Sequence, residues 1–176
     1  TRIPSEKLRI DPAEVAADHD VFDCKYVGLG WFGFDEEKDG QHYDDFIRIY
    51  KPVAKTLKEN GKYFMYHNHD GEFKKYNGKL VIERLAEEFS PDEMGFTLDT
   101  FWVQAGGGDP AQWIKKLSGR DNCVHFKDMV FNTGDNKVRI APIGAGNMNY
   151  EAIIEACLES GVEYGFVELD DCYGDD

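Results

Sequence analysis

The sequence predicts an α/β fold with a parallel sheet, and two observations support this. Short apolar segments alternate with amphipathic segments in the order α-β-α-β-α-β-α-β-α-β, which is typical of right-handed βαβ units. Polar residues capable of ligand chemistry directly follow several of the apolar segments, and parallel sheets gather such residues at the carboxyl ends of their strands. Because a closed (β/α)8 barrel needs eight strands and this pattern contains five, we expect an open five-stranded sheet or a partial barrel.

The predicted helices are marked by capping residues as well as by apolar periodicity. Asp11-Pro12 and Asp109-Pro110 each place an N-cap before a proline in the first helical position. Asn60-Gly61 and Gly161 are typical helix stops. Together with the 3.6-residue recurrence of apolar side chains, these signals predict helices over residues 11–20, 43–60, 80–89, 109–118 and 149–160.

The predicted strands are short apolar runs that are bounded by polar or glycine-rich loops. They comprise residues 25–31, 62–66, 94–98, 122–126 and 164–168. Residues 32–42 are rich in glycine and aspartate, and residues 131–139 are polar, so both segments are predicted to be loops.

Length and composition favour a single globular domain over residues 1–176. Apolar residues make up 41% of the chain, charged residues make up 31%, and the net charge is −14. An acidic surface repels phosphate backbones, so we expect no nucleic-acid partner. No apolar run approaches the length of a membrane span, so we expect no membrane partner either. The four cysteines form no CxxC pair, which favours reduced thiols in a cytoplasmic protein.

Four short runs at strand ends contain the candidate metal ligands His67, Asp99, His125 and Glu168. The segments between them are long enough for a helical return each time, so all four runs can reach the same edge of a parallel sheet. Imidazole and carboxylate groups are the usual ligands of divalent transition metals. The sequence therefore predicts one divalent metal ion, either Mn, Zn, Co or Mg. Each residue also has an alternative role. His125 could be a buried core histidine, Asp99 a turn residue and Glu168 a carboxylate that caps a helix.

Other residues in these runs are candidates for catalysis or substrate binding. His69 lies two residues after His67 and shares its face of the strand, so one of the two imidazoles can bind metal while the other contacts substrate. Lys127 shares a face with His125 and can contact a substrate hydroxyl, a phosphate or Asp128. A surface salt bridge is the alternative for Lys127.

Aromatic and glycine residues near the strand ends allow more than one interpretation. Trp31 and Trp102 can stack on the apolar face of a sugar, or they can simply fill the mouth of the barrel. Gly144-Ala-Gly146 lies where many barrels bind phosphate through backbone N–H groups. Because Arg139 is the basic residue near it, a phosphorylated substrate is not required. The glycine run 106–108 lacks the spacing of a dinucleotide-binding loop.

Several segments resemble the xylose-isomerase-like TIM barrels, specifically the sugar phosphate isomerase/epimerase group. They are Tyr66-His-Asn-His-Asp-Gly-Glu-Phe73, Thr97-Leu-Asp-Thr-Phe-Trp102, Gly107-Gly-Asp-Pro110, Val124-His-Phe-Lys-Asp128, Ile143-Gly-Ala-Gly-Asn147 and Val167-Glu-Leu-Asp170. The resemblance implies a partial (β/α)8 TIM barrel that contains strands 4 to 8 and is truncated at both ends.

The resemblance also assigns roles to residues at the strand ends. In that group a divalent cation is usually held by Glu, Asp, His and Glu from successive strands. Asp99, His125 and Glu168 match the second, third and fourth of these ligands. His67 stands where many members have the first glutamate, so the first ligand is either His67 or the nearby Glu72. Epimerases of the group move a proton with two glutamates, and here Glu168 is the one plainly present.

These assignments predict an isomerase or epimerase that acts on a sugar or sugar derivative through a metal-bound enediolate. We expect Glu168 to be a base as well as a ligand, His67 and Lys127 to assist, and His69, Glu72 and the two tryptophans to bind substrate. An inosose-type dehydratase, a 3-keto-glycoside lyase and a non-catalytic carbohydrate-binding or subunit-pairing member are the alternatives. The expected partner is a small sugar or keto-sugar. Five βα units would leave sheet edges exposed, so we also expect association with another chain, for example as a homo-oligomer.

Overall fold

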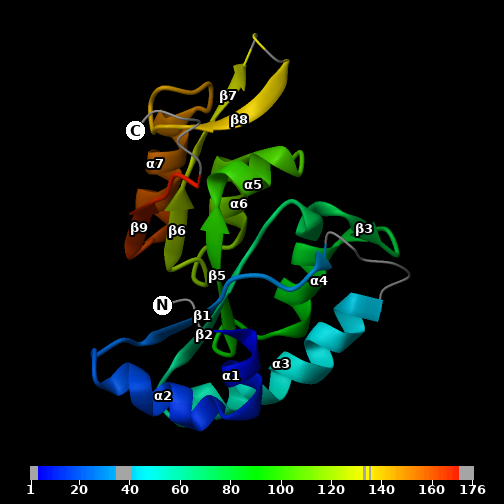
Figure 1. Cartoon of the computed structure of the whole chain (residues 1–176), viewed down its shortest axis with the longest axis vertical. Helices are drawn as coiled ribbons and strands as arrows, with labels where there is room; N and C mark the ends of the chain where they lie inside the picture. The colour runs from blue at the N-terminus through cyan, green and yellow to red at the C-terminus, as the bar shows by residue number, and fades with distance from the viewer. Residues whose placement is uncertain (1–3, 35–40, 133, 135, 171–176) are drawn as a thin grey trace.

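The main sheet contains five parallel strands in the order β1-β2-β5-β6-β9, and it curls into part of a barrel (Figure 1). The computed structural model describes residues 4–34, 41–132, 134 and 136–170. The strands of the main sheet are β1 (Tyr26–Leu29), β2 (Tyr63–His67), β5 (Met94–Asp99), β6 (Cys123–Phe126) and β9 (Tyr164–Val167). The five predicted strands and the partial barrel are thus confirmed.

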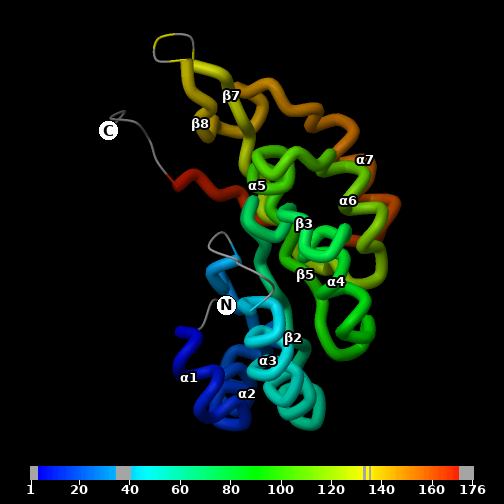
Figure 2. The backbone as a smooth tube through the Cα atoms, turned by 90° about the vertical axis from the view of Figure 1, so that its right-hand side faces the viewer, coloured from blue at the N-terminus to red at the C-terminus, as the bar shows by residue number. Residues whose placement is uncertain are grey.

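Helices α1 (Ser5–Ile10) and α2 (Pro12–Asp20) precede β1, and the other helices connect successive strands of the main sheet. These are α3 (Gln41–Glu59), α4 (Val81–Glu88), α5 (Thr100–Ala105), α6 (Pro110–Lys116) and α7 (Tyr150–Ser160). Asp11, Asp109 and Asn149 each accept a hydrogen bond from a backbone N–H in the first turn of the helix that follows, as the capping pattern predicts. Figure 2 shows α6 and α7 side by side along one side of the strands.

Side chains along each strand alternate between two faces of the sheet. One face packs against the helices and forms the core, where Tyr66, Phe96 and Val124 are fully buried. The other face lines the inside of the curl. Met65 and Thr97 point there and contribute to a cavity of about 420 Å³ that extends up to His67 and His125. Side chains at every second position therefore face the inside of the partial barrel.

The segment after β6 differs from the sequence-based expectation. Residues 131–139 were predicted to form a polar loop, but most of them belong to an antiparallel hairpin of β7 (Asp128–Asn132) and β8 (Lys137–Ala141). Phe131 pairs with Val138 and Met129 pairs with Ile140. β7 contains the apolar run Met129–Phe131, and in β8 the apolar Val138 and Ile140 alternate with charged residues. These β-branched and aromatic residues are the strand signal.

Five short elements of the described structure were also missed. Helices α1 and α5 each have six residues, too few for a periodic apolar pattern to be distinctive. A short 3₁₀ helix η2 (Gly71–Phe73) and the two-residue strands β3 (Lys75–Tyr76) and β4 (Lys79–Leu80) fill the connection from β2 to α4. Residues 35–40 of the predicted loop and residues 171–176 lie outside the described residues.

The strand at one end of the sheet has an exposed apolar surface. In β9, Tyr164 is 51% exposed, Phe166 is 48% exposed and Val167 is 75% exposed. Within the part of the chain that the structure describes, neither β1 nor β9 pairs with a further strand. Open edges of this kind favour pairing with another chain, so the association remains a prediction.

Among the described residues, no helix is both long enough and apolar enough to cross a membrane.

Asp121, two residues before β6, provides a prediction about stability. Its side chain is buried, and Oδ2 has no hydrogen-bond partner in the described structure. Burial raises the pKa of Asp121 to about 6, above the ordinary value of 3.8. The folded state therefore holds the proton of Asp121 more tightly than the unfolded chain does. The stabilisation that this protonated carboxyl gives is fully present below pH 3.8, and it is lost as the pH rises through about 6. We expect Asp121→Asn to increase the free energy of unfolding at neutral pH by about 2–3 kcal/mol.

Urea unfolding at acidic and at neutral pH measures this effect. The stabilisation should be present at neutral pH and should disappear near pH 4, where Asp121 is protonated. Asp44→Asn is a matched control because Asp44 is exposed in the first turn of α3, where the change should alter stability by only a few tenths of a kcal/mol. Equal stability of Asp121→Asn and the wild type at neutral pH would contradict the prediction.

Candidate metal centre

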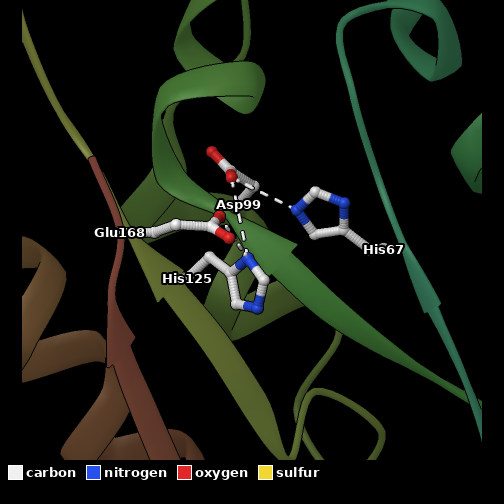
Figure 3. Close-up of side chains that lie close together, drawn as sticks. All are labelled: His67, Asp99, His125 and Glu168. Carbon is white, nitrogen blue, oxygen red and sulfur yellow. Dashed lines mark hydrogen bonds and ion pairs between the residues drawn. The ribbon is translucent and has the colours of Figure 1, made fainter. Parts of the chain in front are cut away.

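Four side chains from the ends of neighbouring strands meet inside the partial barrel (Figure 3). His67 ends β2, Asp99 ends β5, His125 lies in β6 and Glu168 directly follows β9. The register aligns them, because Asp99 pairs with His125 across the sheet and Phe126 pairs with Val167, the residue before Glu168. One potential ligand atom from each residue lies within 4.8 Å of all the others. The sheet therefore brings the four predicted ligands together at one edge.

Asp99 lies at the centre of this cluster. Its Oδ2 is 3.2 Å from Nε2 of His67 and 4.0 Å from Nδ1 of His125. Its Oδ1 accepts a hydrogen bond from the backbone N–H of Trp102, which caps α5. The amide oxygen of Asn68 accepts a hydrogen bond from the backbone N–H of Asp99. One hydrogen bond therefore holds the carboxylate and the other holds the backbone of Asp99, while the second carboxylate oxygen faces the histidines.

The charge state of Asp99 is set by opposing effects. Burial alone would raise the pKa of this fully buried carboxyl, but the hydrogen bond from His67 and the charges of His67 and Lys127 more than offset burial, so the pKa is lowered. The carboxyl group is therefore ionised at neutral pH. An ionised carboxylate with no exposure to water needs a cation nearby.

The hydrogen bonds of His67 indicate how its ring is oriented. Nδ1 lies 3.1 Å from the carbonyl oxygen of Gly30, and a carbonyl can only accept, so Nδ1 carries the proton. Nε2 is then 3.2 Å from the Asp99 carboxylate and needs either a second proton or a cation between the two groups. A histidine that donates one ring N–H to a backbone carbonyl and presents its other nitrogen to the site is typical of metal ligands.

Lys127 adds a positive charge to the cluster. Its ammonium lies 3.1 Å from Oδ2 of Asp99, 2.7 Å from Oε2 of Glu168 and 2.8 Å from Oδ2 of Asp170. Burial would lower the pKa of Lys127, but the charge of Asp99 and hydrogen bonds to all three carboxylates raise it. The hydroxyl of Thr100 bonds to the backbone N–H and C=O of Lys127 and so holds this segment in place.

Asp170 was not among the predicted site residues, because a solvated loop residue was the expectation there. It is about half exposed and directly contacts Lys127. The sequence offered one usable signal, because Asp170 lies two residues after Glu168 and a side chain at that spacing returns to the same face of an extended segment.

Glu72 lies outside the cluster of four. Its side chain is fully buried beneath the turn that follows β2, where it accepts hydrogen bonds from the Tyr66 hydroxyl and from the backbone N–H of His69. Burial raises the pKa of Glu72, and these two hydrogen bonds oppose the rise. In this position Glu72 holds the turn that carries His69 and directly follows His67.

The aromatic candidates lie at different distances from the histidines. The ring of His69 is 4.8 Å from that of His67 and 5.2 Å from that of Trp102, measured between centroids. Trp102 therefore lines the same edge of the barrel as the candidate ligands. Trp31 follows β1 and is 54% exposed, and its ring packs close to Gly33.

The donor set is chemically suited to a divalent cation. It offers two imidazole nitrogens and two carboxylate oxygens, a combination common at zinc, manganese and cobalt sites. Asp99 is fully buried and Glu168 has an exposed side, which is the arrangement expected of a site that substrate can reach.

Comparisons with known proteins agree with this fold. A curated relative, the "probable endonuclease 4" of Mycobacterium leprae (strain Br4923), is 24% identical over 163 residues, which covers 91% of this chain and 62% of the relative. A sugar phosphate isomerase/epimerase structure from Parabacteroides distasonis superposes with a TM-score of 0.78 at 21% identity, covering 97% of this chain and 59% of that one. This chain therefore spans about three fifths of the length of these proteins.

A third comparison concerns a protein crystallised with a metal. A xylose isomerase-like TIM barrel protein from Mycobacterium smegmatis, described in complex with magnesium, has a TM-score of 0.69 at 15% identity over 96% of this chain and 62% of that one. The family model described as "xylose isomerase-like TIM barrel" matches residues 16–169. Because this match covers most of the sequence, the chain belongs to the xylose isomerase-like TIM barrel family.

Proposed function

We propose that this protein uses a divalent metal ion to isomerise or epimerise a sugar or sugar derivative. The observation that supports this most directly is the convergence of His67, Asp99, His125 and Glu168 from four strand ends. The family contains enzymes, among them proteins described as sugar phosphate isomerases/epimerases. A bound divalent cation would stabilise negative charge on two adjacent substrate oxygens.

Within this proposal the reaction begins with proton removal by Glu168. Its carboxylate takes a proton from the carbon next to the substrate carbonyl, and the C–H electron pair forms a C=C bond while the carbonyl oxygen gains negative charge. The ammonium of Lys127 is 2.7 Å from Oε2 of Glu168. From there it can donate a hydrogen bond to the substrate oxygen that gains the negative charge. Glu168 can return the proton to the former carbonyl carbon. The proton of the adjacent hydroxyl moves to the former carbonyl oxygen, so the C=O group now lies on the neighbouring carbon and the isomerisation is complete.

Epimerisation would need a second group on the opposite face of the substrate. The imidazoles of His67 and His69 are the candidates, because His67 stands where the resemblance places the first glutamate and His69 adjoins it. An inosose-type dehydratase or a 3-keto-glycoside lyase would share the first proton abstraction and differ in the group that then leaves. A non-catalytic sugar-binding or subunit-pairing role is the further alternative.

An endonuclease is the second candidate function, because the curated relatives are named as probable endonucleases. The net charge of −14 argues against it, since a DNA-binding surface needs positive charge to contact phosphates. Salt-sensitive binding of DNA that contains an abasic site would favour this alternative over the sugar enzyme.

Hydrogen exchange tests the proposed chemistry even while the sugar substrate is unidentified. The protein, supplied in turn with Mn, Zn, Co or Mg, is incubated with a panel of ketoses in D₂O, and proton NMR follows deuterium entering the carbon beside the carbonyl. We expect exchange with at least one ketose, and we expect Glu168→Gln to slow it by about 10²- to 10⁴-fold. The products then separate isomerisation, epimerisation, dehydration and cleavage.

Glu163→Gln is the matched control for this experiment. Glu163 precedes the same strand but lies at its other end, where it accepts hydrogen bonds from Tyr26 and Asn122. The control should retain wild-type exchange. Absence of exchange with every ketose and metal, in protein that binds metal, would remove the isomerase proposal and leave the sugar-binding role.

A further inference from the structure

The loop between β8 and α7 wraps around a carboxylate of the protein itself. Asp128, the first residue of β7, is 1% exposed. Its Oδ2 accepts hydrogen bonds from the backbone N–H groups of Gly144 at 2.9 Å and Gly146 at 3.0 Å. Its Oδ1 accepts from those of Met148 at 3.2 Å and Met129 at 2.7 Å. Four backbone donors therefore converge on one buried anion.

The glycines of this loop are required by the close packing around the carboxylate. A Cβ atom at Gly146 would lie 2.4 Å from Oδ1 of Asp128, far closer than any real contact between such atoms. Gly144 has a φ of +81°, a backbone conformation that glycine adopts without strain. The loop sequence is thus matched to a carboxylate in the centre. We name this arrangement of Asp128 with the backbone N–H groups of residues 129, 144, 146 and 148 the Asp128 cradle.

The cradle lies next to the candidate metal centre, in a loop where many barrels bind phosphate. Asp128 directly follows Lys127, whose ammonium contacts the candidate metal ligands. In (β/α)8 barrels the loops after the last two strands are where backbone N–H groups commonly bind the phosphate of a substrate. In this protein the backbone N–H groups of Gly144, Gly146 and Met148 are bound to an internal carboxylate, so these three donors are not open to a phosphate group.

We propose that Asp128 is a specificity-determining residue that fills the phosphate-binding position and restricts the site to non-phosphorylated sugars. This inference rests on the proposed function, which supplies the sugar substrate. The loop forms an anion-binding position, and the side chain of Asp128 occupies it. Removing the side chain should therefore open a position that accepts a free anion.

The charges at the neighbouring cluster agree with a neutral substrate. Asp99, Glu168 and Asp170 surround the single ammonium of Lys127, which leaves two negative charges that one divalent cation would balance. A phosphate dianion beside this cluster would face these three carboxylates. The ammonium of Lys127 could not offset the repulsion, because all three carboxylates already share it. Like charges repel, and their repulsion is stronger where the groups are partly buried.

Thermal unfolding with inorganic phosphate as the probe tests the proposal. We expect the Tm of the wild type to be the same in phosphate and in chloride of equal ionic strength. Asp128→Ala should have a lower Tm in chloride, and phosphate at tenfold above its Kd should raise that Tm by roughly 3–6 °C. Phosphorus NMR line broadening by Asp128→Ala, and not by the wild type, would show the binding directly.

Two control variants separate the cradle from general effects of lost stability. Asn149→Ala removes the N-cap of α7 and leaves Asp128 in place, so it should be destabilised without any specific response to phosphate. Asp128→Asn keeps the volume but replaces one acceptor oxygen by an NH₂ group, so it should be destabilised and still exclude phosphate. If Asp128→Ala folds only when phosphate is present, that rescue supports the proposal as well.

Two results would overturn the proposal. Specific stabilisation of the wild type by phosphate would show that the protein has a vacant phosphate site. A folded Asp128→Ala that ignores phosphate would show that the four donors do not form an anion-binding position. Neither result depends on catalysis, so failure here is distinct from failure of the isomerase proposal. Once a ketose substrate is found, its phosphate ester should have a kcat/KM at least tenfold lower in the wild type.

Discussion

Asp99→Asn will remove bound divalent metal from the protein while leaving the fold intact. Asp99 supplies the only fully buried carboxylate among the four candidate ligands, and its Oδ2 faces both histidines. An amide is a far weaker ligand than a carboxylate for Zn or Mn, and it also removes one of the charges that balance the cation. The amide oxygen can still accept from the N–H of Trp102, so the cap of α5 is retained. We expect metal affinity to fall by at least about 100-fold.

Metal content by plasma mass spectrometry, on protein purified without chelator, measures this loss. The wild type should contain about one equivalent of metal and Asp99→Asn should contain none above background. Asp170→Asn is the matched control, because Asp170 contacts Lys127 but lies outside the cluster of four, so that variant should keep its metal. Full metal content in Asp99→Asn, or none in the wild type after reconstitution, would contradict the proposed metal centre.

The placement of the candidate ligands was predictable from the sequence because each follows an apolar strand. In a parallel sheet the strand ends share one edge, and alternate residues share one face. His67, Asp99, His125 and Glu168 satisfy both conditions, and the register of the sheet places them within reach of one another. The metal itself remains a prediction, since convergence of ligands does not determine what binds between them.

Interactions that depend on side-chain direction in loops were beyond the sequence. Asp128 was considered only as a possible partner of Lys127, yet its carboxylate organises the loop that contains Gly144 and Gly146. Glu72 appeared as a candidate ligand, yet it lies buried beneath the turn, bound to the Tyr66 hydroxyl. In both cases the partners are backbone or side-chain groups whose positions are set only when the chain has folded.

Lys127→Met will make the stability of the protein depend on bound metal. In the wild type the Lys127 ammonium neutralises carboxylates that include two candidate metal ligands, Asp99 and Glu168. Without the ammonium these negative charges face one another, and the buried Asp99 loses a cation. Removing one partner of a buried ion pair costs about 3–5 kcal/mol, and we expect about 3 kcal/mol here because Glu168 and Asp170 are partly exposed.

Urea unfolding with chelator and with saturating zinc measures the effect. In chelator, Lys127→Met should be far less stable than the wild type, and zinc should recover most of the difference because a divalent cation replaces the lost charge. Lys62→Met is a matched control: Lys62 is a buried lysine that pairs with Asp20 away from the cluster, so zinc should not correct its loss of stability. If zinc stabilises Lys127→Met no more than it stabilises the wild type, Lys127 does not share its carboxylates with the metal. The roles of Asp99 and Glu168 as joint ligands would then have to be abandoned.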